Sequence, residues 1–191
     1  MNELFREVRG DLARYGGGRS GAQIFLSSLL LSLGFQVCLS YRIYSRVQRW
    51  AVIGPWFQRI IALATTVWSG AQISATAKIG PGLYLPHPIG IVIANNTIIG
   101  VDVDIYQGVT IGRIRGNDPR AAIIGDGVSI YAGAKILGPV SIGDRAEIGA
   151  NAVVLRNVPA DAAAVGVPAR VYLKKNRSGP SLVERISGAV E

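Results

Sequence analysis

A six-residue spacing of branched apolar residues constrains this 191-residue chain more than any other feature. The spacing holds from residue 73 to residue 154, and Gly or Ala often follows directly. The thirteen anchors are Ile73, Ile79, Leu85, Ile93, Ile99, Ile105, Ile111, Ile124, Ile130, Ile136, Ile142, Ile148 and Val154. Self-similarity at a fixed period is the signature of a solenoid, whose stacked repeats share one core. Six residues per side and three sides per turn predict a triangular solenoid with coils of about 18 residues and inward-pointing anchors.

The hexad phase slips twice, and both slips are insertions. The gap between Leu85 and Ile93 is two residues longer than a hexad, and the gap between Ile111 and Ile124 is seven residues longer. Insertions in repeat proteins become surface loops, which often carry the functional site. The larger insertion is rich in arginine and glycine, so we expect a flexible basic loop there.

Residues 1–70 read as helical, residues 71–173 as the repeat and residues 174–191 as a polar tail. Leu4, Val8 and Leu12 form one helical stripe, residues 24–41 carry no charge, and Pro55 suits the first turn of a further helix. The chain is therefore predicted to be mainly β with an N-terminal helical region. We expect these helices to pack on a neighbouring domain or subunit, with peripheral membrane contact over residues 24–68 as the second interpretation.

Composition narrows the possible functions. A single His and a single Cys exclude zinc sites built from several imidazoles or thiolates, so no metal site is predicted. The net charge is +8, and the Lys and Arg residues form no long run, so we predict no nucleic-acid partner. No cleavage-site pattern follows the apolar stretch, which predicts a cytoplasmic protein, at most peripheral to the inner face of a membrane. Cys38 falls in that apolar stretch and is predicted to be a buried structural thiol.

The only histidine, His87, lies beside the smaller phase slip. It falls two places after the anchor Leu85, so its side chain is predicted to face outward. A neutral imidazole within hydrogen-bond reach of a hydroxyl can take its proton as the hydroxyl attacks an acyl group. Its position at a register break makes His87 our candidate general base.

The repeat region resembles a known group of enzymes through six short strings. They are Ala77-Lys78-Ile79-Gly80, His87 with Gly90-Ile91-Val92-Ile93, Gln107-Gly108-Val109-Thr110-Ile111-Gly112, Ala132-Gly133-Ala134-Lys135-Ile136-Leu137-Gly138, Ile148-Gly149-Ala150-Asn151-Ala152-Val153-Val154 and Gly166-Val167-Pro168-Ala169-Arg170-Val171. With these strings the region resembles the hexapeptide-repeat acyltransferases, and within them the serine acetyltransferase family. The resemblance implies a left-handed parallel β-helix of about five coils, a homotrimer, and acetyl-CoA bound in a groove between two solenoids.

The same resemblance assigns roles to individual residues. It implies that His87 is the general base of a direct attack on the thioester, without an acyl-enzyme. It implies that the small side chains of Ala132 and Ala150 let the pantetheine arm approach the backbone. Four further residues are proposed to contact CoA, chiefly its phosphates, and they are Arg113, Arg170, Lys174 and Lys175.

The sequence departs from the serine enzymes around the acceptor. Gln72 stands where those enzymes pair their histidine with an aspartate, Pro86 replaces an acidic residue, and an Arg-His pair becomes Arg120-Ala121. Asn95 falls in a rebuilt string after the histidine, and Gln107 lies one coil above His87 in the hexad register. We therefore expect Gln72 to orient His87, and Gln107, Arg120 and Asn95 to contact the acceptor.

A site without carboxylates has little to hold an α-ammonium. With these departures the sequence more closely resembles the serine-acetyltransferase-like enzymes of exopolysaccharide and capsule assembly. That resemblance implies an O-acetyltransferase that acetylates a sugar hydroxyl, on a saccharide that could be lipid-linked. The alternative is a serine O-acetyltransferase of cysteine biosynthesis. A non-catalytic β-helix that serves as a scaffold is the third hypothesis.

Overall fold

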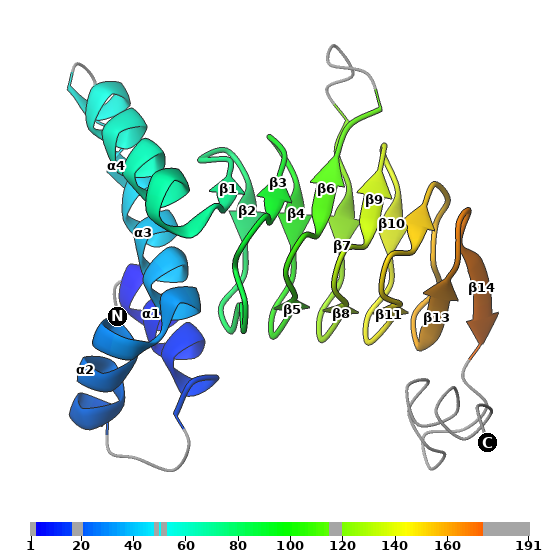
Figure 1. The fold of residues 1–191 in the computed structure, drawn as a ribbon, viewed down its shortest axis with the longest axis horizontal. Coiled ribbons are helices and arrows are strands. Elements are labelled where there is room, and N and C mark those ends of the chain that lie inside the picture. The colour runs from blue at the N-terminus through cyan, green and yellow to red at the C-terminus, as the bar shows by residue number, and fades with distance from the viewer. Residues whose placement is uncertain (1–2, 17–20, 48–49, 51–52, 115–119, 174–191) are drawn as a thin grey trace.

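The chain folds into a cluster of helices followed by a long prism of short strands (Figure 1). The computed structural model describes residues 3–16, 21–47, 50, 53–114 and 120–173. The helices are α1 (Glu3–Ala13), α2 (Gly21–Leu31), α3 (Leu33–Val47) and α4 (Gly54–Ser69). Helix α4 ends at Gly70, whose left-handed backbone donates its N–H to the Thr66 carbonyl, and the first strand begins two residues later.

The strands form the three faces of the prism. Face A contains β1 (Gln72–Ile73), β3 (Val92–Ile93), β6 (Thr110–Gly112), β9 (Lys135–Leu137) and β12 (Val153–Val154). Face B contains β2 (Lys78–Ile79), β4 (Ile98–Ile99), β7 (Ile123–Ile124) and β10 (Ser141–Ile142). Face C contains β5 (Asp104–Ile105), β8 (Ser129–Ile130), β11 (Glu147–Ile148), β13 (Ala162–Val165) and β14 (Arg170–Leu173). Neighbouring strands are parallel on every face, except that β14 folds back antiparallel to β13.

The predicted anchors form the core of the prism. On face A, Ile93 pairs in register with Ile73 on one side and with Ile111 on the other, and faces B and C repeat the pattern. None of the thirteen anchors is more than 6% exposed. Burying an aliphatic side chain of this size contributes about 1.5–3 kcal/mol, so the stacked anchors supply a large part of the stability. The predicted triangular solenoid is therefore confirmed.

The uncharged segment at residues 24–41 forms two helices rather than one. The Ser32 hydroxyl accepts a hydrogen bond from the Phe35 N–H at 3.3 Å, which caps α3 and separates it from α2. The two helices meet at 98°. Among the described residues, no single helix is both long enough and apolar enough to cross a bilayer, although the bent pair α2 and α3 meets those criteria jointly.

Helix α3 packs directly on the first coil of the prism (residues 71–90). The backbone of Gly34 lies so close to the Leu85 carbonyl that no Cβ would fit there. Tyr41 donates its hydroxyl hydrogen to the Ala77 carbonyl at 2.7 Å, and Tyr44 donates to the Ile73 carbonyl at 2.5 Å. Helices and coils thus share one continuous core. The division into three domains at residues 70 and 173 stays a prediction, and the tail lies outside the described residues.

A buried ion pair joins α1, α3 and the first coil. The Arg42 guanidinium is 1% exposed and donates two hydrogen bonds to Asp11, at 2.9 and 3.0 Å. It also donates to the carbonyls of Ile79 and Gly80. One Asp11 oxygen in turn accepts the N–H groups of Gly82 and Leu83, both at 3.0 Å. These bonds satisfy both charges and fix the helices on the prism.

We predict that Arg42→Met lowers the free energy of unfolding by about 3–5 kcal/mol, because it leaves the Asp11 carboxylate buried without its cation. Urea unfolding followed by circular dichroism measures the change. Arg145→Met is the matched control, because Arg145 pairs with Asp161 on an exposed surface and its loss should shift the midpoint little. An equal effect of both substitutions would contradict this role of Arg42.

Cys38 is fully buried in α3, where its thiol donates to the Leu83 carbonyl at 3.6 Å. Burial raises the pKa of Cys38 well above its ordinary value. We therefore predict no reaction of the native protein with Ellman's reagent on the timescale of an enzyme assay, and one thiol per chain after denaturation in guanidinium. A fast native reaction would show that the Cys38 environment is open.

Candidate active site

One edge of the prism gathers four of the predicted site residues, His87, Gln107, Ala132 and Ala150. This C–A corner is the edge at which the chain passes from face C to face A, once in every coil. Backbone bonds connect its successive turns: Gly108 N–H to the Ile89 carbonyl at 2.9 Å, Gly133 N–H to the Gln107 carbonyl at 2.8 Å, and Asn151 N–H to the Ala132 carbonyl at 2.8 Å. The turns are therefore stacked in register along the prism.

The corner depends on left-handed backbone conformations. Gly90, Gly108 and Gly133 have φ of 71°, 68° and 74°, and Asn151 takes the same place in the next coil with φ of 56°. Residues other than Gly and Asn rarely adopt this left-handed backbone region. This explains why the hexad strings contain Gly at these positions: Gly lets the chain turn the corner with similar geometry in each coil.

His87 stands at the start of this corner, and its side chain is exposed. It lies between Pro86 and Pro88, whose rings fix the backbone φ on either side, and Pro88 is buried. The two-residue insertion therefore projects the imidazole from a rigid turn rather than from a mobile loop. The outward orientation predicted from the hexad register agrees with this exposure.

Gln107, Ala132 and Ala150 follow His87 along the corner, each in a successive coil. Gln107 and Ala150 are exposed and Ala132 is partly exposed. The side chains of Tyr106 and Tyr131 stack beside them, with ring centroids 5.5 Å apart. The two alanines leave the corner backbone accessible, so an extended chain could lie along it and hydrogen-bond to peptide groups. Together these residues form a track that begins at His87.

Gln72 and Asn95 lie together in a different place. Both line a hollow of about 330 Å³ between α4 and face A, which Thr66 and Val92 also border. His87 does not line this hollow. Within the described part of the chain, Gln72 and His87 share no hydrogen bond. The structure thus brings Gln72 and Asn95 together, while the predicted orienting contact from Gln72 stays a prediction.

Lys135 is a candidate that the sequence interpretation missed. Its ammonium donates to the Gly108 carbonyl at 2.5 Å and to the Thr110 hydroxyl at 3.2 Å, so a positive charge lies against the C–A corner on face A. Lys135 directly precedes the inward anchor Ile136. The alternation of inward and outward residues could have placed this charge on the same outer face as Gln72.

The predicted basic contacts are spread widely over the molecule. Arg113 and Arg120 border the larger insertion, whose residues 115–119 lie outside the described residues, as do Lys174 and Lys175. Arg170 is exposed on β14 at the C-terminal end of the prism. Of the described residues among these contacts, only Arg170 follows the last turn of the C–A corner, where Gly166 and Ala169 bond to Val153 of the last coil.

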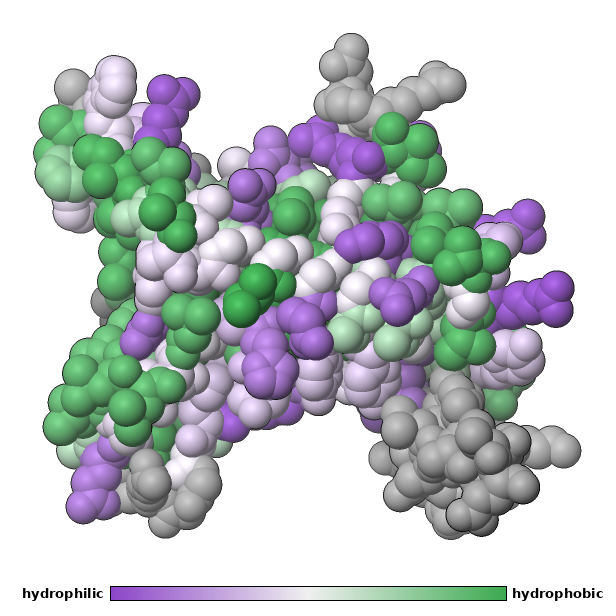
Figure 2. Space-filling model, viewed as in Figure 1, coloured by the Kyte–Doolittle hydropathy of each residue, from purple (hydrophilic) through white to green (hydrophobic). Residues whose placement is uncertain are grey.

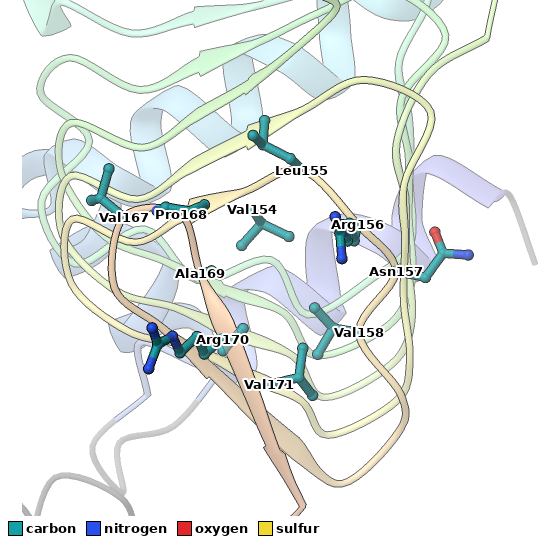
Figure 3. A pocket seen from close by; sticks show the side chains of 11 residues that line it. Val154, Leu155, Arg156, Asn157, Val158, Val167, Pro168, Ala169, Arg170 and Val171 are labelled. Carbon is teal, nitrogen blue, oxygen red and sulfur yellow. The ribbon is translucent and has the colours of Figure 1, made fainter.

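A hollow of about 600 Å³ opens at that C-terminal end. Figure 3 shows its lining residues arranged around the last coil, with Val154 and Val158 at the centre and Arg156 and Arg170 among the side chains that surround them. It lies several coils from His87, so it is not where the imidazole acts. It does give the corner track a basic end.

The comparisons with known proteins agree with this geometry. The family described as "Bacterial transferase hexapeptide (six repeats)" matches residues 121–156. A serine acetyltransferase of Synechococcus elongatus is 35% identical over 172 residues, which cover 90% of this chain and 70% of that protein. A serine acetyltransferase of Helicobacter pylori is 38% identical over 149 residues, which cover 76% of this chain and 85% of that protein.

Solved structures extend the likeness to the fold. A serine acetyltransferase in complex with CoA superposes with a TM-score of 0.78 at 35% identity, covering 89% of this chain and 70% of the other. Soybean serine acetyltransferase complexed with serine gives 0.80 at 32% identity, with 89% and 70% covered. These matches confirm the predicted left-handed parallel β-helix with an N-terminal helical region.

The prediction of a sugar O-acetyltransferase of polysaccharide biosynthesis is wrong. The relatives at 35–44% identity and the solved structures named above are serine acetyltransferases, which was the alternative. The prediction rested on the missing carboxylates at Gln72 and Pro86 and on the missing histidine at Ala121. An ammonium group can also donate to uncharged oxygen acceptors, so missing carboxylates do not exclude serine. The saccharide acceptor is withdrawn with it.

The likeness includes both the helices and the prism, and it extends over most of the chain and most of the first relative. It confirms the predicted hexapeptide-repeat acyltransferase and the prediction that the chain is an enzyme. The chain belongs to the serine acetyltransferase family.

Proposed function

We propose that this protein is a serine O-acetyltransferase, which transfers the acetyl group of acetyl-CoA to the hydroxyl of L-serine. The observation that carries the proposal is the C–A corner, which aligns His87 with a backbone track of small side chains. The track suits the pantetheine arm of CoA. Relatives of known structure bind CoA and serine on the same fold, which supports both substrates.

In the proposed reaction the His87 imidazole takes the proton of the serine hydroxyl. The oxygen attacks the carbonyl carbon of the thioester, and the new C–O bond forms as the carbonyl becomes an oxyanion. When the oxyanion collapses, the C–S bond breaks and the departing sulfur receives the proton from the imidazolium. The products are O-acetylserine and CoA, and no acyl-enzyme forms.

Other residues bind rather than react. Ala132 and Ala150 leave room for the pantetheine arm, and Arg170 lies where the corner track ends, so it is placed to meet the CoA phosphates. Gln72 is proposed to orient the His87 imidazole, and Asn95 to contact the serine. Arg120 is proposed to pair with the serine carboxylate. Gln107 is proposed to contact the serine beside His87.

The assembly is proposed to be a homotrimer. His87 and the corner track lie on the outside of a single prism, where bulk water would surround the thioester. A second prism placed along the C–A corner would turn this open track into a groove and exclude water from the reacting atoms. A trimer provides three such grooves.

The proposed reaction predicts the effect of removing the base. With acetyl-CoA and L-serine, His87→Ala should lower kcat by about 10²–10⁴, because the serine hydroxyl loses its proton acceptor. Release of the CoA thiol to Ellman's reagent measures the rate, and the buried Cys38 should not add to this signal. Lys78→Ala is the control, because Lys78 is exposed on face B, away from the corner.

Two outcomes would contradict the proposal. Full activity of a folded His87→Ala protein would mean that the base lies elsewhere. Thiol release that depends on some other hydroxyl compound, but not on L-serine, would show that the acceptor is wrong. A panel that includes L-serine, L-threonine and simple sugars separates these cases.

The proposed reaction also predicts the effect of blocking the corner track. Ala132→Leu places a branched side chain on the C–A corner, where the pantetheine arm is proposed to lie. We expect KM for acetyl-CoA to rise at least about tenfold, since about 1.4 kcal/mol of lost contact has that effect, while KM for serine changes little. Initial rates at varied acetyl-CoA measure this, and an unchanged KM for acetyl-CoA would contradict the track.

A further inference from the structure

Helix α4 exposes a wide apolar face. Trp56, Ile60, Leu63 and Val67 recur at helical spacing and are 68%, 63%, 64% and 78% exposed. Phe57 and Trp68 extend the same side, whereas Ile61 and Thr65 turn inward towards the protein. Figure 2 shows apolar side chains gathered over α4 and again over α2, at the helical end of the molecule. Exposing so large an apolar surface to water has a free-energy cost, and such surfaces commonly mark an interaction site.

Helix α2 adds a second apolar element at the same end. It has no charged residue over Gly21–Leu31, and Leu26, Leu30 and Leu31 are 58%, 66% and 84% exposed. All three tryptophans of the chain, Trp50, Trp56 and Trp68, are also exposed here. Tryptophan favours the boundary between apolar chains and polar headgroups, because its ring is apolar and its N–H is polar.

The charge of this region is mainly positive. The sequence contains no Asp or Glu from residue 12 to residue 101, while the net charge of the chain is +8. Arg59 on α4 lies 6.0 Å from the Trp56 ring, and Arg6 and Arg9 are exposed on α1. Of the acidic residues on α1, Glu7 and Asp11 are engaged by Arg46 and Arg42, and Glu3 is exposed. Arg59 thus places a positive charge beside the apolar face, and α2, α3 and α4 contain no acidic residue.

We propose that the exposed side chains of α4 and α2, with Trp50 and Ile53, form a docking surface for the headgroup region of an anionic lipid bilayer. The helix would lie in the plane of the membrane, since its 16 residues span only roughly 24 Å, less than the hydrocarbon core of about 30 Å. Apolar burial and attraction of Arg to anionic lipid act together in such binding. The proposed reaction does not need this surface, so the inference goes beyond it.

A bilayer explains these features better than a second copy of the chain. In a two-fold contact the same face meets itself, so Arg59 would approach its own counterpart, and neither α4 nor α2 carries an acidic residue to pair with it. An anionic membrane supplies the missing negative charge. It also accounts for the exposed tryptophans, which a contact between copies does not require.

The test is cosedimentation of the full chain with vesicles. One set contains phosphatidylcholine with about a third phosphatidylglycerol, and the other contains phosphatidylcholine alone. We expect the protein to bind the anionic vesicles at least about tenfold more tightly, and 0.5 M salt to abolish most of this preference. Equal binding to both sets, or no binding to either, would overturn the proposal.

Two variants locate the surface. Trp56→Ser combined with Ile60→Ser should weaken binding to anionic vesicles at least about tenfold, because two exposed apolar side chains no longer enter the interface. The matched control is Tyr172→Ser with Leu173→Ser, an equally exposed aromatic and aliphatic pair on β14 at the far end of the prism, which should bind like the wild type. Equal loss in both would overturn the assignment to α4.

Two further measurements separate this proposal from its rivals. Thiol release with L-serine should be unchanged in the α4 variant, so failure of the docking surface and failure of the proposed function can be told apart. Sedimentation velocity should show the same assembly for the variant and the wild type. A smaller assembly of the variant, together with no vesicle binding by the wild type, would identify the α4 face as a contact between copies instead.

Discussion

The left-handed turn at each C–A corner is the constraint on which the rest of this structure depends. Gly90, Gly108, Gly133 and Asn151 let the chain change direction at the same point in every coil, and the bonds between turns keep the coils in register. With the register fixed, the anchor of each side points inward and stacks on its neighbours above and below. The same turns align the outward residues into a track, so the device that builds the core also builds the site.

The helical region is fixed to this prism by polar contacts that the repeat does not predict. Arg42 and Asp11 hold two helices against the carbonyl and amide groups of the first coil, where the stack would otherwise end with unpaired backbone groups. The N-terminal end is therefore closed by helices, whereas at the C-terminal end β14 folds back antiparallel to β13 on face C and leaves a hollow around Val154. His87 lies in the first coil, on which the helices pack, so the backbone that carries the proposed base is held in place.

The sequence predicted the prism well because its hexad repeat depends on local rules. All thirteen anchors are buried, and the phase slip at His87 corresponds to a projecting turn. The break between α2 and α3 at Ser32 lies outside the repeat, so the hexad period could not predict it. The period could place Lys135 on the outer side of face A, but it could not show the bonds of its ammonium to the neighbouring coil. The acceptor was wrong for a related reason: Gln72 and Asn95 were judged as missing charges, one position at a time, whereas the structure brings their amides together in one hollow.

The central claim is that the C–A corner leads the thioester to His87. A crystal structure of the protein with CoA and L-serine tests it most directly. The account predicts the CoA sulfur at the His87 end of the corner, the pantetheine arm along Ala132 and Ala150, and the serine hydroxyl about 2.6–3.2 Å from an imidazole nitrogen. A CoA whose sulfur lies instead in the C-terminal hollow around Val154, coils away from His87, would contradict it.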